Sequence, residues 1–79
     1  MIQESIGKFI AQERKNAGMT QEQFAEKLGV SNRSVSRWEN GKTMPAFSLF
    51  PLICQILKIS TTELLNGKRI EKIDMNHTK

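Results

Sequence analysis

The stretch TQEQFAEKLGVSNRSVSRWENGK, residues 20–42, decides the fold because it contains two short amphipathic helices separated by a brief turn. Thr20 and Gln23 match a capping box, in which each side chain bonds the backbone N–H of the other residue. Ser31 is placed to cap the second helix. Two helices joined only by residues 29–31 must cross at a steep angle.

Such a crossing needs a small residue where the helices approach, a glycine in the turn and apolar side chains at its centre. Seven residues of the stretch satisfy these needs. We predict that the core of this helix-turn-helix consists of Phe24, Ala25, Leu28, Gly29, Val30, Val35 and Trp38.

Polar side chains gather on one arc of the second helix, at about 100° per residue. They match the edges of bases in the DNA major groove, where arginine pairs with guanine and asparagine with adenine. We predict base contacts from Asn32, Arg33, Ser36 and Arg37, with Asn40 on the same arc. The alternative is an ordinary solvated surface, which two basic residues alone do not exclude. The joint pattern of caps, turn and core favours the DNA interpretation.

The rest of the sequence predicts three further helices. No segment alternates apolar and polar residues with the two-residue period of a strand. Residues 5–17 form the first of these helices. A fourth helix covers residues 48–57, with Ser48 as its N-cap and Pro51 in its first turn. The fifth opens at Ser60 with a second capping box. The predicted fold is therefore all-α, a compact five-helix domain over residues 1–67, followed by a basic tail or linker stub over residues 68–79.

Composition narrows the classes of function for this 79-residue chain. The net charge of +4 favours an acidic partner, and the positive excess lies in residues 31–42 and from Lys68 onward. The single cysteine, Cys54, belongs to no metal-ligand pattern, and no catalytic constellation is present. No apolar run has the length of a membrane span. We expect a cytoplasmic binding protein that is not an enzyme and needs no cofactor or metal.

The segment TQEQFAEKLGVSNRSVSRWENGKTMP resembles the helix-turn-helix of the Xre-like family, the phage lambda-repressor and Cro type of DNA-binding domain. The resemblance extends over residues 5–66 and includes the five-helix layout. It implies a sequence-specific, double-stranded DNA-binding transcription regulator, encoded by a bacterium or phage, that acts at the nucleoid. We expect it to repress transcription.

The resemblance also implies roles for residues outside the base-contacting arc. Gln21, Asn40 and Lys42 correspond to positions that contact the DNA backbone. Arg14 and Glu39 correspond to a structural ion pair that joins the first and third helices, a pairing that burial of either charge would require.

Two positions depart from the family pattern. Lys58 stands where members often have glycine, and Ala46 stands where a capping aspartate or serine is common. Both departures are expected to reduce stability without touching the recognition helix.

The fourth helix carries a second apolar stripe, made of Leu49, Leu52 and Ile56, beyond what its core face needs. We predict that this stripe is the face of a homodimer, which would place two recognition helices about 34 Å apart on a palindromic operator. Alternatively, the fifth helix and the tail cover it within the monomer. The stripe also leaves room for other functions: an antitoxin or adaptor that acts through a protein partner, or the DNA-binding head of a longer regulator.

Overall fold

The computed structural model describes residues 2–70 and confirms the all-helical fold class within that range. Five α-helices and one 3-10 helix follow one another along the chain. They are α1 (Ile2–Asn16), α2 (Gln21–Leu28), α3 (Asn32–Glu39), η1 (Phe47–Leu49), α4 (Phe50–Leu57) and α5 (Thr61–Asn66). Of the predicted tail, residues 71–79 lie outside the described part of the chain.

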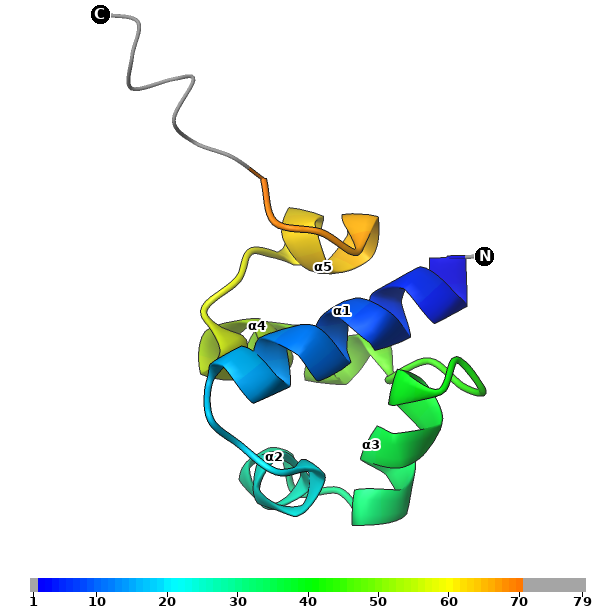
Figure 1. Ribbon diagram of the computed structural model, residues 1–79, viewed down its shortest axis with the longest axis vertical. Coiled ribbons are helices and arrows are strands. Elements are labelled where there is room, and N and C mark those ends of the chain that lie inside the picture. The colour runs from blue at the N-terminus through cyan, green and yellow to red at the C-terminus, as the bar shows by residue number, and fades with distance from the viewer. Residues whose placement is uncertain (1, 71–79) are drawn as a thin grey trace, which may run out of the picture.

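The long helix α1 is the element on which the others assemble (Figure 1). It packs against α3 on one side and α5 on another, while α2 packs against α3 and also reaches α4. In Figure 1, α2 and α3 lie together at the end of the molecule farthest from α5. The helix-turn-helix therefore protrudes from a scaffold made by α1, α4 and α5.

Three of the predicted helix starts are present with their capping bonds. Thr20 accepts the Gln23 N–H at 3.0 Å and its own N–H donates to Gln23 Oε1 at 2.9 Å, which completes the capping box. Ser31 caps α3, and Ser60 forms the second capping box with Glu63. Local side-chain caps thus determine where these helices begin.

The predicted start of the fourth helix was wrong. Instead of a helix capped by Ser48, a 3-10 turn over Phe47–Leu49 leads directly into α4, and no side chain caps either element. Pro51 lies in the first turn of α4, where its missing N–H costs nothing. The first helix also begins earlier than predicted, at Ile2.

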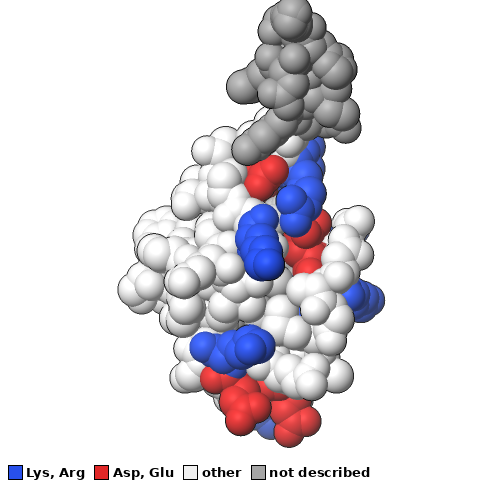
Figure 2. Space-filling model, turned by 90° about the vertical axis from the view of Figure 1, so that its left-hand side faces the viewer, with Lys and Arg blue, Asp and Glu red and all other residues white. Residues whose placement is uncertain are grey.

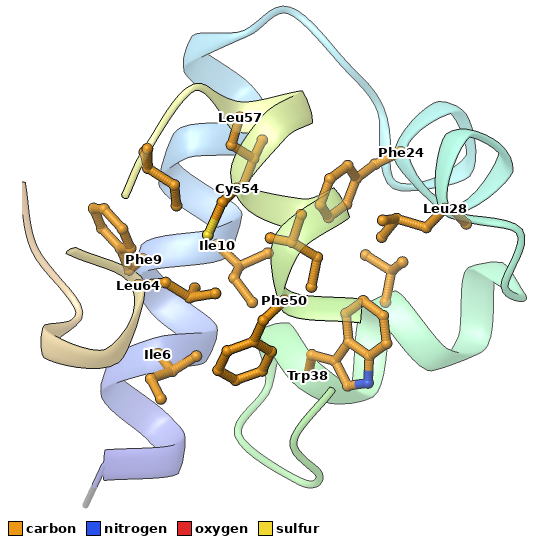
Figure 3. Close-up of a cluster of buried hydrophobic side chains, with 14 residues drawn as sticks. Ile6, Phe9, Ile10, Phe24, Leu28, Trp38, Phe50, Cys54, Leu57 and Leu64 are labelled. Atoms are coloured by element: carbon orange, nitrogen blue, oxygen red, sulfur yellow. The ribbon is translucent and has the colours of Figure 1, made fainter. Parts of the chain in front are cut away.

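All the elements contribute side chains to one apolar core (Figure 3). Of the seven predicted helix-turn-helix core residues, five are buried: Phe24, Ala25, Leu28, Val35 and Trp38. Val30 is partly buried against the core, and Gly29 forms the turn with a φ of 75°. The remaining core residues come from α1, α4, α5 and Ile59 in the loop before α5, so the helix-turn-helix shares one core with the rest of the domain.

No group of His, Cys, Asp or Glu between residues 2 and 70 could hold a metal ion. No helix in the same range is long and apolar enough to cross a membrane.

Candidate nucleic-acid interface

Helix α3 has one buried and one solvent-facing side. Val35 and Trp38 lie in the core at 0% and 5% relative exposure, whereas Asn32, Arg33 and Arg37 are exposed. The spacing of three residues between Val35 and Trp38 puts both on one stripe, so the arginines are directed away from it. The structure therefore leaves two guanidinium groups and one carboxamide available to a partner outside the chain.

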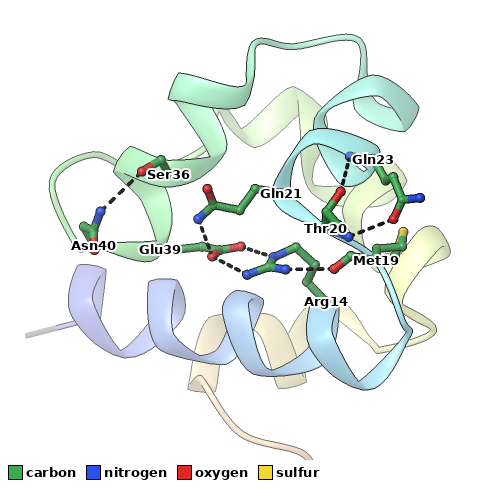
Figure 4. A network of polar contacts seen from close by, with 8 residues as sticks. All are labelled: Arg14, Met19, Thr20, Gln21, Gln23, Ser36, Glu39 and Asn40. Atoms are coloured by element: carbon green, nitrogen blue, oxygen red, sulfur yellow. Dashed lines mark hydrogen bonds and ion pairs between the residues drawn. The ribbon is translucent and has the colours of Figure 1, made fainter.

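Ser36 and Asn40 lie on the same outer side of α3, but their side chains are partly engaged with each other. Ser36 is half-buried, and Asn40 Nδ2 lies 3.4 Å from its hydroxyl, a long hydrogen bond (Figure 4). Because the side chain of serine is short, Ser36 projects little from the surface of the helix. A duplex can approach α3 closely here.

A polar network fixes α3 relative to α1 and α2 (Figure 4). The Arg14 guanidinium donates to both carboxylate oxygens of Glu39, through Nε at 2.7 Å and Nη2 at 3.0 Å, and through Nη1 to the Met19 carbonyl at 2.8 Å. The side chains of Arg14 and Glu39 are only 9% and 6% exposed. The ion pair expected from the resemblance is thus present, and it is buried.

The bidentate geometry explains why these buried charges are tolerated. Forked guanidinium–carboxylate pairs combine charge attraction with two aligned hydrogen bonds, which offsets part of the desolvation cost. The hydrogen bonds to Glu39 raise the pKa of Arg14, although burial acts in the opposite direction. Because Glu39 ends α3, the pair holds the C-terminal end of α3 against α1.

Gln21 connects the second helix to the same carboxylate. Its Nε2 donates to Glu39 Oε1 at 2.9 Å, and its side chain is half-buried. Gln21 therefore braces α3 through Glu39. A carboxamide nitrogen carries two hydrogens, so the bond to Glu39 leaves one for a further acceptor.

Beyond α3, the backbone amides are already engaged inside the chain. The N–H of Asn40 donates to Ser36 O at 3.0 Å, that of Gly41 to Trp38 O at 3.0 Å and that of Lys42 to Arg37 O at 2.8 Å. These three N–H groups are therefore occupied within the chain. The exposed side chains of Asn40 and Lys42 remain as the donors.

The predicted dimer stripe is only partly exposed. Leu49 and Ile56 pack partly against the core, whereas Leu52 is 36% exposed on α4. On the neighbouring α5, Leu65 is 47% exposed. Both α4 and α5 therefore carry an exposed leucine, and Leu65 was not among the residues predicted for the stripe.

The sequence analysis also missed two buried acids and their partners. Glu13, whose side chain is 5% exposed, accepts from Arg69 through Nη2 at 2.8 Å and Nε at 3.1 Å, and the Glu13 carboxylate in turn raises the pKa of Arg69. Glu63 accepts the N–H of Ile70 at 2.9 Å. The segment after Gly67 is thereby attached to α1 and α5. The capping box signalled the importance of Glu63, but no local pattern relates residues 13 and 69.

Comparison with known proteins identifies the arrangement. A family model described as helix-turn-helix matches residues 10–64. The antitoxin PezA of Streptococcus pneumoniae is 38% identical, over 82% of this chain and 41% of that protein. The transcriptional activator BcrR of Enterococcus faecalis is 36% identical, over 77% of this chain and 30% of that protein.

A third relative matches this chain over most of its own length. The transcriptional repressor RstR of the cryptic phage CTXphi in Vibrio cholerae is 34% identical, over 89% of this chain and 74% of that protein. The chain spans less than half the length of the other two relatives.

Proposed function

The chain belongs to the helix-turn-helix family of Xre-like domains, and we propose that it is a transcription regulator that binds a specific sequence of double-stranded DNA. The observation that carries the proposal is the outer side of α3, where Arg33 and Arg37 are exposed on a helix held rigidly by Val35 and Trp38. The protein acts by binding, with no chemical step.

In the proposed complex, α3 lies in the major groove. Arg33 and Arg37 donate paired hydrogen bonds to guanine O6 and N7, and Asn32 pairs with adenine N6 and N7. Ser36 lies between the two arginines and allows the helix to approach the base edges. The rigid support from Glu39 keeps the donors in register, since base discrimination depends on fixed geometry.

Phosphate contacts flank the helix and set its position along the duplex. Gln21 uses the amide hydrogen that Glu39 leaves free, and Lys42 supplies a flexible ammonium from the loop after α3. Asn40 reaches the same strand through its side chain. Such contacts increase affinity for any sequence and make binding sensitive to salt.

The proposed regulator is a homodimer on a palindromic operator in the bacterial cytoplasm, at the nucleoid. One recognition helix makes few contacts, whereas two helices about 34 Å apart occupy successive major grooves on one face of the DNA. We place the dimer contact at Leu52 and Leu65. In this proposal residues 1–67 are the DNA-binding unit, and residues 68–79 are a basic tail or linker stub.

We propose repression as the outcome. Occupancy of a promoter suffices to exclude polymerase, whereas activation requires a further contact with the transcription machinery. The similarity to RstR, which is named a repressor, supports repression. The similarity to BcrR, which is named an activator, supports activation instead. Reporter expression from a promoter that carries the selected operator distinguishes the two.

The test of the proposal is a selection of binding sites from random duplex DNA at physiological salt. We expect a palindrome with half-sites about one helical turn apart. On that site, Arg33→Ala or Arg37→Ala should cost about 1 to 3 kcal/mol and relax selection at one base pair per half-site. Lys42→Ala should weaken binding to all sequences and reduce the salt slope by about one unit.

Lys8→Ala is the matched control, because Lys8 is an exposed cation on α1 outside the proposed interface. It should leave both the selected sequence and the salt slope unchanged. Recovery of no motif, or unchanged base preferences in the two arginine variants, would contradict the proposed base contacts.

The similarity to PezA supports a second candidate, an antitoxin-type protein that acts mainly through a protein partner. The two candidates make opposite predictions for the selection. A partner-dependent protein alone would give only generic, salt-sensitive DNA binding and would gain sequence preference when its partner is added.

A further inference from the structure

An open hollow of about 510 Å3 lies where α1, α4 and the turn between α1 and α2 come together. Met19, Ile56 and Leu57 contribute its apolar floor. A second open hollow of about 420 Å3 lies beside it along the turn, and Met19 and Lys27 line both. Two neighbouring open hollows, together called the groove here, suit an extended or helical peptide better than a compact small molecule.

Basic side chains surround this floor. Lys27 comes from α2, Lys58 from the end of α4 and Arg69 from the segment after α5. Two carboxylates also line the hollows: Glu13 in the main one, which is already paired with Arg69, and Glu26 in the second. Figure 2 views the molecule from the side on which α1 and α4 end, and shows Lys and Arg over this surface, with uncharged surface and patches of Asp and Glu between and beside them.

Lys58, one of the basic residues around the groove, has an unfavourable backbone conformation. Its φ of 57° makes it the one non-glycine residue between residues 2 and 70 in the left-handed region. Glycine would adopt this conformation freely, whereas a side chain there is disfavoured. A lysine at this position adds a cation to the groove at the expense of the α4 cap. Strained residues of this kind are found preferentially at functional sites.

The groove is separate from the proposed DNA interface. None of the residues that line either hollow belongs to residues 31–42. Its apolar floor is unsuited to a phosphate backbone, which prefers polar donors and cations throughout. An occupant of the groove could therefore be bound while α3 contacts DNA.

From the cations around an apolar floor, we infer that this groove binds an acidic segment with apolar side chains, carried by a protein partner. Carboxylates of the segment pair with Lys27 and Lys58, while its apolar side chains lie against Met19 and Ile56. This assignment goes beyond the proposed function, because it adds a protein-binding surface distinct from the DNA-binding one.

The experiment is nuclear magnetic resonance of the isotope-labelled full chain, titrated with a short peptide of alternating glutamate and leucine pairs. We expect saturable shifts at the groove, including the amides of Met19, Lys27 and Lys58, and none at residues 31–42. A peptide with glutamine in place of leucine tests the apolar floor, and one with lysine in place of glutamate tests the charge. Both should bind at least about tenfold more weakly.

The variant Lys27→Glu/Lys58→Glu should weaken binding of the acidic peptide by about tenfold or more, because it reverses two of the three rim charges. Lys8→Glu makes the same change of charge per site at an exposed position outside the groove, and should alter affinity by less than about twofold. An unchanged spectrum of the free variants confirms that both remain folded.

Several outcomes would overturn the inference. One is a loss of peptide affinity in Lys8→Glu that equals, per reversed charge, the loss in Lys27→Glu/Lys58→Glu. The effect would then follow from the net charge of the protein and not from the groove. Another is equal binding of the glutamine peptide. Shifts of the groove signals on addition of duplex DNA would assign the groove to nucleic acid, and shifts with protein concentration alone would assign it to self-association.

Discussion

Arg14 is the residue on which the geometry of the recognition helix most depends. It holds the end of α3 through Glu39 and the start of the α1–α2 turn through the Met19 carbonyl. We expect Arg14→Met to lower the free energy of unfolding by about 3 kcal/mol, because Glu39 is left buried with only Gln21 as a partner. Urea denaturation measures the loss.

The double variant Arg14→Met/Glu39→Leu is the control for this interpretation. Replacing both charges removes the unpaired carboxylate, so part of the stability should return. Additive losses in the two single variants would show that packing, not the pair, is responsible. Operator binding should remain impaired even where stability recovers, because Gln21 loses its anchor on α3.

At the scale of the helices, the contact between α1 and α3 depends on a glycine. A methyl group at Gly7 would overlap the backbone carbonyl oxygen of Trp38, and backbone cannot rotate away as a side chain can. Gly7→Ala would gain about 1 kcal/mol of helix propensity but lose about 1 to 3 kcal/mol from overpacking. We expect a net decrease in thermal stability.

Gln12→Ala provides the comparison, since Gln12 is exposed on the same helix and the change tests helix propensity alone. It should leave the melting temperature unchanged or raise it slightly. If Gly7→Ala behaved in the same way, the close approach of α1 to Trp38 would not be a constraint on stability.

Helix α5 and the segment after it depend on one carboxylate. The N–H groups of Ser60 and Ile70 donate to Glu63, and these bonds lower the pKa of Glu63 despite its burial. Since the folded-state pKa lies below the unfolded one, the stabilisation is complete above the unfolded value of about 4.3. It is lost as the pH falls through the folded-state pKa.

Glu63→Gln should therefore destabilise the protein by about 1 kcal/mol at neutral pH, and the difference should shrink in acid. Glutamine can still accept from Ser60, but its amide group faces the Ile70 N–H as a second donor. Denaturation at a series of pH values tests this. A difference that stays constant down to the acid-unfolding range would exclude the carboxylate as its cause.

At the scale of the whole molecule, the proposed dimer depends on apolar surface shared by α4 and α5. Leu52→Glu should weaken self-association by at least about tenfold, because a charge would be buried at the contact. Light scattering against concentration measures this. Operator binding should weaken in parallel and lose its dependence on half-site spacing.

Gln55→Glu is the matched control, since Gln55 is an exposed neighbour on α4 and receives the same charge. Its mass in solution and its operator affinity should stay close to those of the unchanged protein. A monomeric parent protein that still selects a palindrome would refute the α4–α5 contact.

Most of the fold could be predicted because its determinants are local. Caps such as Thr20 and Ser60 and glycines at helix ends act within a few residues of where they stand. The start of α4 could not be predicted in this way. Ser48 has the right chemistry for a cap, but burial of Phe50 and the first-turn position of Pro51 determine the backbone there instead.

Of the candidate site, the sequence alone determined which residues of α3 share a face, because helical periodicity depends only on spacing. Only the tertiary structure decided which groups stay available. It engages the amides of Asn40 and Lys42 internally and brings Arg69 onto Glu13 across 56 positions of sequence. It also assembles the basic groove from α1, α2 and α4. These contacts depend on how helices pack, and no local pattern records the partner of a side chain that is distant along the chain.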